Sequence, residues 1–216
     1  MIPRLIQLHW FYDVRPIYFD RVVEEYRSKY PTWDVRVVTE IPAMTQELGA
    51  VLEQVPDGRL KADLIRYWLM KRDGGFYVDF DSRPIGSLES LVGKTLVMPL
   101  CALGGAPFID ICLIGSGPGH PFWDVVLEKA LRWKEGRKPK TVFWTGSLIG
   151  SADEHEALGV EVLPVGGVQE ASPEETIGFH KGEMPVLTGE GYIKHYRSVS
   201  KTQRGEVPWV PEWGIG

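Results

Sequence analysis

The sequence has few cysteines and no long hydrophobic run. Its 216 residues include only two cysteines, Cys101 and Cys112, which form neither a zinc-binding motif nor a disulfide framework. This usage fits a reducing compartment, so we expect a cytoplasmic protein, with peripheral contact to the inner membrane face as a further option. No segment contains the roughly 18 consecutive apolar residues of a transmembrane helix, and the first residues, MIPRLIQLHWFYD, predict no signal peptide.

An excess of basic charge is also missing. The chain has 24 Lys and Arg against 29 Asp and Glu, which gives a net charge of −5. Domains that bind nucleic-acid phosphate in bulk are usually basic, so we expect no such binding. Apolar residues make up 44% and charged residues 25% of the chain, which is ordinary for a globular protein and excludes disorder as its main state.

The hydrophobic pattern predicts an α/β fold. A strand over Ile2–His9, a helix over about 17–30 and a strand over Trp33–Thr39 form the first unit of an open sheet. The further elements that we predict are helices at about 42–53, 60–72 and 120–134, and strands at 76–81, 95–100, 108–114 and 160–165. This order favours a mixed, mostly parallel sheet with helices on both faces. We expect one domain over 1–216, with a core over about 1–150 and a loop-rich C-terminal part over about 151–216.

The segment Phe76–Asp81 ends in two carboxylates, Asp79 and Asp81. Residues two apart in a strand point to the same face, and ligands bind beyond the carboxyl ends of strands in α/β sheets. Two like charges this close favour a cation between them, and Mg²⁺ or Mn²⁺ accepts such oxygen ligands. The pair therefore predicts a clamp for a metal ion and a diphosphate. The alternative is a solvated acidic turn before Pro84.

The helix before this strand carries Asp63 and Arg66 among mostly apolar residues. The two are three positions apart and share a helix face. They form either a surface ion pair, worth about 0–1 kcal/mol, or part of a polar pocket, which the apolar surroundings favour. Because the Gly74-Gly75 turn returns the chain, the pair is expected to converge with the two carboxylates on a nucleotide sugar.

The segment KADLIRYWLMKRDGGFYVDFDSRPIGSLESL resembles the sugar-binding Asp-x-Asp region of glycosyltransferase family 32. That family includes capsular-polysaccharide and mannosyl transferases and is related to the large glucosylating bacterial toxins. IPRLIQLHW at the N-terminus and GPGHPF at 117–122 resemble further family segments. The positions matched in the central region are Ala62, Asp63, Arg66, Tyr67, Gly74, Gly75, Tyr77, Asp79 and Asp81.

The resemblance implies a GT-A fold and a metal-dependent, retaining hexosyltransferase that uses a UDP- or GDP-sugar. It implies that Asp81 binds Mn²⁺ or Mg²⁺ directly. Asp79 would face the ribose and sugar of the donor, with its metal contact through water, while Asp63 and Arg66 would hold the donor-sugar hydroxyls. We count these four residues as the catalytic set.

The resemblance also implies donor contacts from Tyr77 and from the end of the first strand, Leu8, His9 and Trp10. His195 corresponds to the family's C-terminal histidine and is the third candidate metal ligand. The basic segment Tyr192–Arg204 around it is expected to be a mobile lid over the diphosphate. The alternative is a solvated basic tail.

The acceptor is left open by the sequence. A glycan, a lipid-linked sugar, a protein side chain or a modified nucleobase all fit. Two other functions compete with sugar transfer. One is a nucleotide-sugar-binding protein without activity, and the other is a phosphatase of the haloacid-dehalogenase type, which also places Asp-x-Asp after an apolar strand such as Phe76–Asp81.

Overall fold

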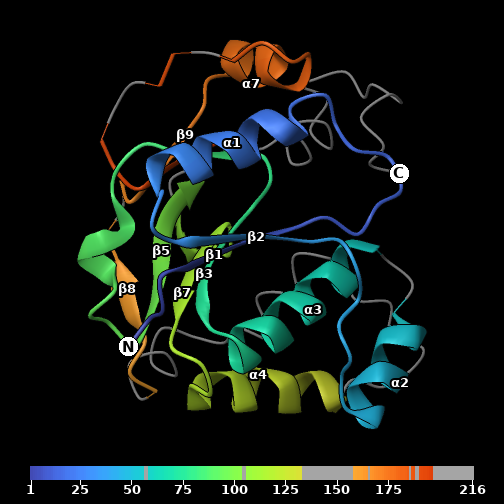
Figure 1. Ribbon diagram of the computed structural model, residues 1–216. Coiled ribbons are helices and arrows are strands. Elements are labelled where there is room, and N and C mark those ends of the chain that lie inside the picture. Colours follow the sequence, from blue (N-terminus) through green and yellow to red (C-terminus); the bar gives the residue numbers. More distant parts are fainter. Residues whose placement is uncertain are drawn as a thin grey trace.

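A computed structural model describes residues 1–55, 58–103, 106–132, 158–164, 166–184, 186–187 and 190–196. A seven-stranded sheet has the strand order β2-β1-β3-β7-β5-β6, and β8 pairs with β5 (Figure 1). β1, β2, β3, β5 and β8 run in one direction, and β6 and β7 run against them. The mixed, mostly parallel sheet is thus confirmed. The strands are β1 (Leu5–His9), β2 (Asp34–Val38), β3 (Gly75–Val78), β5 (Leu96–Leu103), β6 (Ala106–Ile109), β7 (Leu113–Ser116) and β8 (Glu161–Leu163).

Helices cover both faces of this sheet, as predicted (Figure 1). Successive strand residues point to opposite faces, so Phe76 and Val78 of β3 join the apolar cluster under one face, whereas Tyr77 joins the cluster under the other. The first cluster is covered by α1 (Phe19–Lys29). The second is covered by α2 (Gln46–Gln54), α3 (Gly58–Arg72) and α4 (Pro121–Leu131).

A second, three-stranded sheet brings the C-terminal part of the chain to the segment after β3. β10 (Ile193–His195) pairs antiparallel with β4 (Ser82–Pro84) and parallel with β9 (Val168–Glu170). The nearby helices are α7 (Pro173–His180) and the short 3₁₀ helix η1 (Leu88–Leu91). None of β9, α7 and β10 was predicted, because each is short and weakly patterned.

The turn between α3 and β3 requires its two glycines. Gly74 and Gly75 have φ of 64° and 90°. Residues other than glycine rarely adopt such backbone angles. A Cβ at Gly74 would lie 2.5 Å from the carbonyl oxygen of Ser116, and one at Gly75 would lie 2.6 Å from that of Leu5. The predicted tight return is therefore confirmed, and it places α3 beside β3.

Two strand predictions were wrong in their bounds. The strand predicted over 76–81 ends at Val78, because Ser82–Pro84 pairs with β10 in the other sheet. The strand predicted over 108–114 is divided between β6 and β7. A turn separates them, in which a carboxylate oxygen of Asp110 accepts a hydrogen bond from the Cys112 amide at 3.0 Å.

Helix bounds changed less. The helix predicted from Pro42 begins at Gln46, because the Thr45 side chain caps it by accepting from the Leu48 amide at 3.3 Å. Within the described ranges, no helix combines the length and apolar character needed to cross a membrane.

Candidate donor and metal site

Asp79 and Asp81 lie on a turn at the carboxyl end of β3. The Asp79 amide donates to the carbonyl of Cys112 at 3.0 Å, and the Ser82 amide donates to the carbonyl of Asp79 at 3.0 Å. Hence a turn, and not one face of a strand, brings the two carboxylates together. The position agrees with the prediction, since ligands bind beyond the carboxyl ends of strands in α/β sheets.

Arg66 links α3 to this turn. Its Nη2 lies 3.1 Å from Oδ1 of Asp79, and its Nη1 lies 3.5 Å from Oδ1 of Asp63 and donates to the Ile111 carbonyl at 3.3 Å. The guanidinium carbon sits 4.0 Å from the ring centre of Tyr77, and the Tyr77 hydroxyl donates to Asp79. The prediction that α3 and the Asp-x-Asp segment converge is therefore met.

The Asp63–Arg66 pair is not a surface ion pair, since each residue is only 8% exposed. Burial opposes the charge of Arg66, but Tyr77, Asp79 and Asp63 outweigh it and raise the pKa of Arg66 above its usual value. Arg66 therefore stays a cation inside the protein. Removing one partner of a buried pair leaves an uncompensated charge, which makes this pair structurally important.

β10 carries His195 to the two carboxylates. Its Nε2 lies 3.2 Å from Oδ1 of Asp81 and 3.6 Å from Oδ2 of Asp79. One ligand atom from each of the three residues lies within 4.8 Å of the other two. Burial opposes ionisation of Asp81, but His195 outweighs it and holds the pKa of Asp81 below its usual value. Two carboxylates and an imidazole fit a divalent cation such as Mn²⁺.

Three residues of the predicted lid, Ile193, Lys194 and His195, lie in a buried strand and not in a solvated basic tail, while the motion of the segment stays a prediction. These residues form β10 and are 0%, 3% and 6% exposed. The Lys194 ammonium pairs with Glu175 of α7 at 2.5 Å, so its charge is already balanced within the protein. Residues 197–204 of the predicted lid lie outside the described residues.

The three donor contacts predicted at the end of β1 do not all lie on the same side of the sheet. His9 lies on the α3 side, with its ring centre 4.7 Å from that of Tyr77. Leu8 is fully buried in the α1-side core, and the Trp10 indole packs against Phe19 and Phe80 in the same core. Their side chains face away from His9 because strand residues alternate. We therefore keep His9 and withdraw Leu8 and Trp10.

His9 belongs to a polar pair that the prediction overlooked. The Gln7 amide donates to the Gly74 carbonyl at 2.7 Å, and its Oε1 lies 3.3 Å from Nε2 of His9. Because Gln7 presents an acceptor, His9 donates from Nε2. Burial, with a further contribution from Arg66, lowers the pKa of His9 well below its usual value, so the imidazole is neutral. Two polar residues at alternate positions of a buried strand were a signal available in the sequence.

Two further features of the site have no local signal. The carbonyl of Ile111 holds Arg66, and that of Cys112 holds the Asp79 amide. Both lie in the turn between β6 and β7, and backbone groups are the same in every residue. Only the sheet topology brings this turn to Arg66 and Asp79.

Comparisons with known proteins bear on the family and the fold. Residues 16–98 match the family described as "Glycosyltransferase sugar-binding region containing DXD motif". No curated protein matches the chain. Among solved structures, the chain is similar to the PaToxG glycosyltransferase, with 14% identity, a TM-score of 0.53, and coverage of 72% of this chain and 70% of that one.

Two other similar structures cover more of the chain at lower TM-scores. A glycosyltransferase involved in the glycosylation of the major capsid of PBCV-1 has 13% identity and a TM-score of 0.44, covering 94% of this chain and 96% of that one. The galactosyltransferase LgtC, in complex with donor and acceptor sugar analogs, has 10% identity and a TM-score of 0.43, covering 96% and 98%.

The fold and the sequence match define an enzyme that transfers sugars. The chain is a glycosyltransferase with a GT-A fold, and its matched region carries the Asp-x-Asp sequence as Asp79-Phe80-Asp81. The phosphatase alternative is thereby set aside. The matched region also includes Asp63 and Arg66, but His195 lies beyond it.

Proposed function

We propose that this glycosyltransferase transfers a hexose from a UDP- or GDP-sugar with the help of Mn²⁺ or Mg²⁺ held by Asp79, Asp81 and His195. The observation that carries the proposal is the convergence of these side chains, with ligand atoms within 4.8 Å of one another. Such a cation neutralises charge on the departing diphosphate when bound. In this proposal Asp81 is a direct ligand, and Asp79 contacts the cation through water.

Asp63 and Arg66 are proposed to position the donor sugar. The guanidinium is fixed from several sides, by Asp79, by the Ile111 carbonyl and by the ring of Tyr77. A side chain that is held in advance loses little freedom when it binds a ligand. Asp63 would accept hydrogen bonds from sugar hydroxyls, and Arg66 would donate them.

His9 and Tyr77 are proposed to contact the nucleotide or the adjoining sugar. Their rings meet edge to face next to Arg66. His9 donates from Nε2 to Gln7, so its Nδ1 carries the lone pair. That atom is buried without a hydrogen-bond partner among the described residues, and it would accept a hydrogen bond from a donor group of the ligand.

We also propose that the transfer retains the anomeric configuration, as the resemblance to family 32 implies. Asp63 and Asp79 both pair with Arg66, which makes either carboxylate a poor nucleophile. Attack of the acceptor from the side of the leaving phosphate, with that phosphate taking the proton, needs no protein nucleophile. Product analysis by proton NMR would distinguish retention from inversion.

The whole chain, 1–216, is proposed to act as one domain. A core limited to about 1–150 would lack His195, which the C-terminal part contributes through β10. The acceptor and the expected cytoplasmic setting stay predictions from the sequence. A nucleotide-sugar-binding protein without activity is the alternative that the following experiment would reveal.

The test is a panel of UDP-, GDP- and CDP-sugars measured with and without Mn²⁺. A ligand that binds only the folded state at about 100 times its Kd raises stability by about 2.7 kcal/mol, which a thermal-shift assay detects. We expect a metal-dependent shift with a UDP- or GDP-sugar, together with slow release of free sugar. A shift without sugar release or transfer to any acceptor would favour the inactive binder, and no shift with any donor would contradict the proposal.

A further inference from the structure

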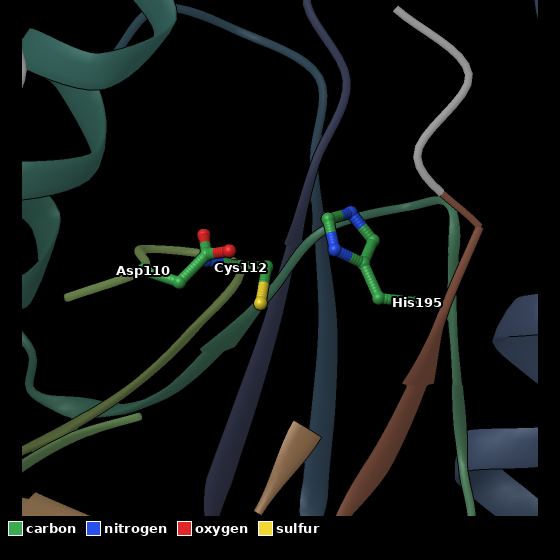
Figure 2. A group of neighbouring side chains, drawn as sticks. All are labelled: Asp110, Cys112 and His195. Atoms are coloured by element: carbon green, nitrogen blue, oxygen red, sulfur yellow. The ribbon is translucent and has the colours of Figure 1, made fainter. Parts of the chain in front are cut away.

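A second group of metal-ligating side chains lies beside the first and shares His195 with it. Asp110, Cys112 and His195 each offer one ligand atom, and these atoms lie within 4.8 Å of one another. Figure 2 shows Asp110 and Cys112 on one side of the group and His195 on the other, with the imidazole ring directed toward the other two residues. The three residues are 8%, 0% and 6% exposed, respectively.

Backbone hydrogen bonds fix the turn that carries Asp110 and Cys112. The Asp110 amide donates to the Pro99 carbonyl at 3.0 Å, and an Asp110 carboxylate oxygen accepts from the Cys112 amide at 3.0 Å. The Cys112 carbonyl accepts from the Asp79 amide, also at 3.0 Å. These ligands are therefore held in advance, directly beside the turn that carries Asp79 and Asp81.

The two groups differ in chemical character. The two carboxylates of the first group suit Mn²⁺ or Mg²⁺, whereas the thiolate of the second favours softer cations such as Zn²⁺. Zinc is commonly four-coordinate with sulfur, nitrogen and oxygen ligands, so Asp110, Cys112, His195 and one water molecule would complete its shell. We propose that Asp110, Cys112 and His195 form a binding site for Zn²⁺ or another thiophilic divalent cation. Binding releases the thiol proton to solvent.

Occupation of this thiol site has a consequence for the neighbouring one. A neutral imidazole has one nitrogen with a lone pair, because the other carries the proton. His195 therefore ligates one cation at a time. Zn²⁺ at the thiol site withdraws His195 from Asp79 and Asp81, and it inhibits the Mn²⁺-dependent reaction. This inhibition rests on the proposed function, whereas the binding of Zn²⁺ does not.

The binding test uses Co²⁺ as a spectroscopic substitute for Zn²⁺ on the full chain. Coordination by a thiolate gives a near-ultraviolet charge-transfer band, which we expect in the wild type and in Asp81→Asn. The band should disappear in Cys112→Ser and on addition of Zn²⁺. Cys101→Ser, which removes the only other cysteine in the chain, should keep it. No band in the wild type, or a band lost in Cys101→Ser and kept in Cys112→Ser, overturns the site.

Asp110→Asn provides a second variant in case loss of the buried thiol prevents folding. The asparagine oxygen still accepts from the Cys112 amide, but the charge is gone. We expect Zn²⁺ affinity, measured by competition with Co²⁺, to fall by about 100-fold or more, since loss of a charged direct ligand exceeds the effect typical of indirect changes. Unchanged affinity in a folded Asp110→Asn variant removes Asp110 from the site.

The inhibition test measures sugar release from the donor with Mn²⁺ and increasing Zn²⁺. Each variant is compared with its own rate in Mn²⁺ alone, since Zn²⁺ also competes at oxygen ligands. The Zn²⁺ concentration for half-inhibition should rise at least about 10-fold in Cys112→Ser, but not in Cys101→Ser. Equal inhibition of Cys112→Ser and wild type overturns the coupling. A Cys112-dependent Co²⁺ band in a protein that neither releases sugar nor transfers it to any acceptor overturns the proposed function and upholds the site.

Discussion

The α3–β3 segment and strand β10 contribute to one site in different ways. The first supplies Asp63, Arg66, Asp79 and Asp81 from a stretch that is continuous in sequence and folded back at Gly74-Gly75. The second supplies only His195, from a short strand whose neighbours β4 and β9 are far apart in the sequence. Local sequence therefore determines the proposed sugar-binding side of the site, whereas completion of the proposed metal-binding side depends on long-range strand pairing.

The largest effects are expected from substitutions at the metal ligands, which test whether the two regions contribute to one function. Asp81→Asn should reduce metal-dependent sugar release by about 100-fold or more, since loss of a direct ligand exceeds the 10–100-fold typical of indirect changes. His195→Ala should reduce it by at least about 10-fold. Rates at saturating donor over a range of Mn²⁺ concentrations measure both effects.

The exposed acid Asp20 on α1 offers a matched control. Asp20→Asn should leave the rate and its Mn²⁺ dependence unchanged. Full activity in His195→Ala would separate β10 from the metal site, and full activity in Asp81→Asn would remove the metal site altogether.

Arg66→Ala tests the sugar side through stability and binding together. It leaves the buried Asp63 and the half-buried Asp79 without their cation, so we expect a loss of about 3–5 kcal/mol in the free energy of unfolding. Titration calorimetry of the folded fraction should show weaker binding of the sugar nucleotide and little change for the bare nucleoside diphosphate.

The surface pair of Arg36 with Asp34 serves as the comparison for Arg66. Arg36 has a side chain that is 43% exposed, so Arg36→Ala should cost no more than about 1 kcal/mol. Equal losses for the two ligands in Arg66→Ala would assign the arginine a structural role only.

Two glycine substitutions test how strictly the α3–β3 turn is required. Gly74→Ala places a Cβ 2.5 Å from the Ser116 carbonyl in a backbone with φ of 64°, so it should destabilise the protein by more than about 1 kcal/mol. Gly49 lies inside α2, and a Cβ at that position would have nothing within 4 Å. Gly49→Ala should therefore stabilise the helix by about 0.5–1 kcal/mol. Urea unfolding measures both, and similar effects in the two variants would argue against a strict requirement at the turn.

The smallest effect concerns the anchoring of β10. The hydrogen bond from Lys194 lowers the pKa of Glu175 below its usual value of 4.5. Because the pKa is lower in the folded state, the pair stabilises the fold at pH values above the usual pKa of glutamate. This stabilisation is lost as the pH falls through the lowered pKa of the folded state. The Glu175 side chain is 30% exposed, so screening by solvent limits the pH-dependent part of this contribution to less than about 1 kcal/mol.

Glu175→Gln should therefore reduce the free energy of unfolding at pH 7 but flatten its decline under acid conditions. Urea titrations of wild type and variant at pH 7 and at acid pH measure the difference. A decline of the same size in both proteins would show that the pair does not anchor β10 detectably.

Local patterns were enough to predict much of the fold and the part of the site that α3 and the segment after β3 supply. A buried apolar run predicted β1, a β-rich run predicted β2, apolar helix faces predicted α1 and α4, and the glycine pair predicted the turn that ends α3. Asp63, Arg66, Asp79 and Asp81 follow from this part of the sequence. The predicted strand over 76–81 was too long because nothing local indicates that Ser82–Pro84 pairs with β10 in a different sheet.

The sequence by itself determined which residue types stand at the carboxyl end of β3 and how α3 returns to them, because those relations span only a few turns of chain. The tertiary structure decided which side chains at the end of β1 reach the site, with His9 facing Tyr77 and Leu8 and Trp10 facing the core. It also decided that His195 stands between two carboxylates and a thiol. Strand pairing over long sequence separation depends on the whole sheet, and no local pattern contains it.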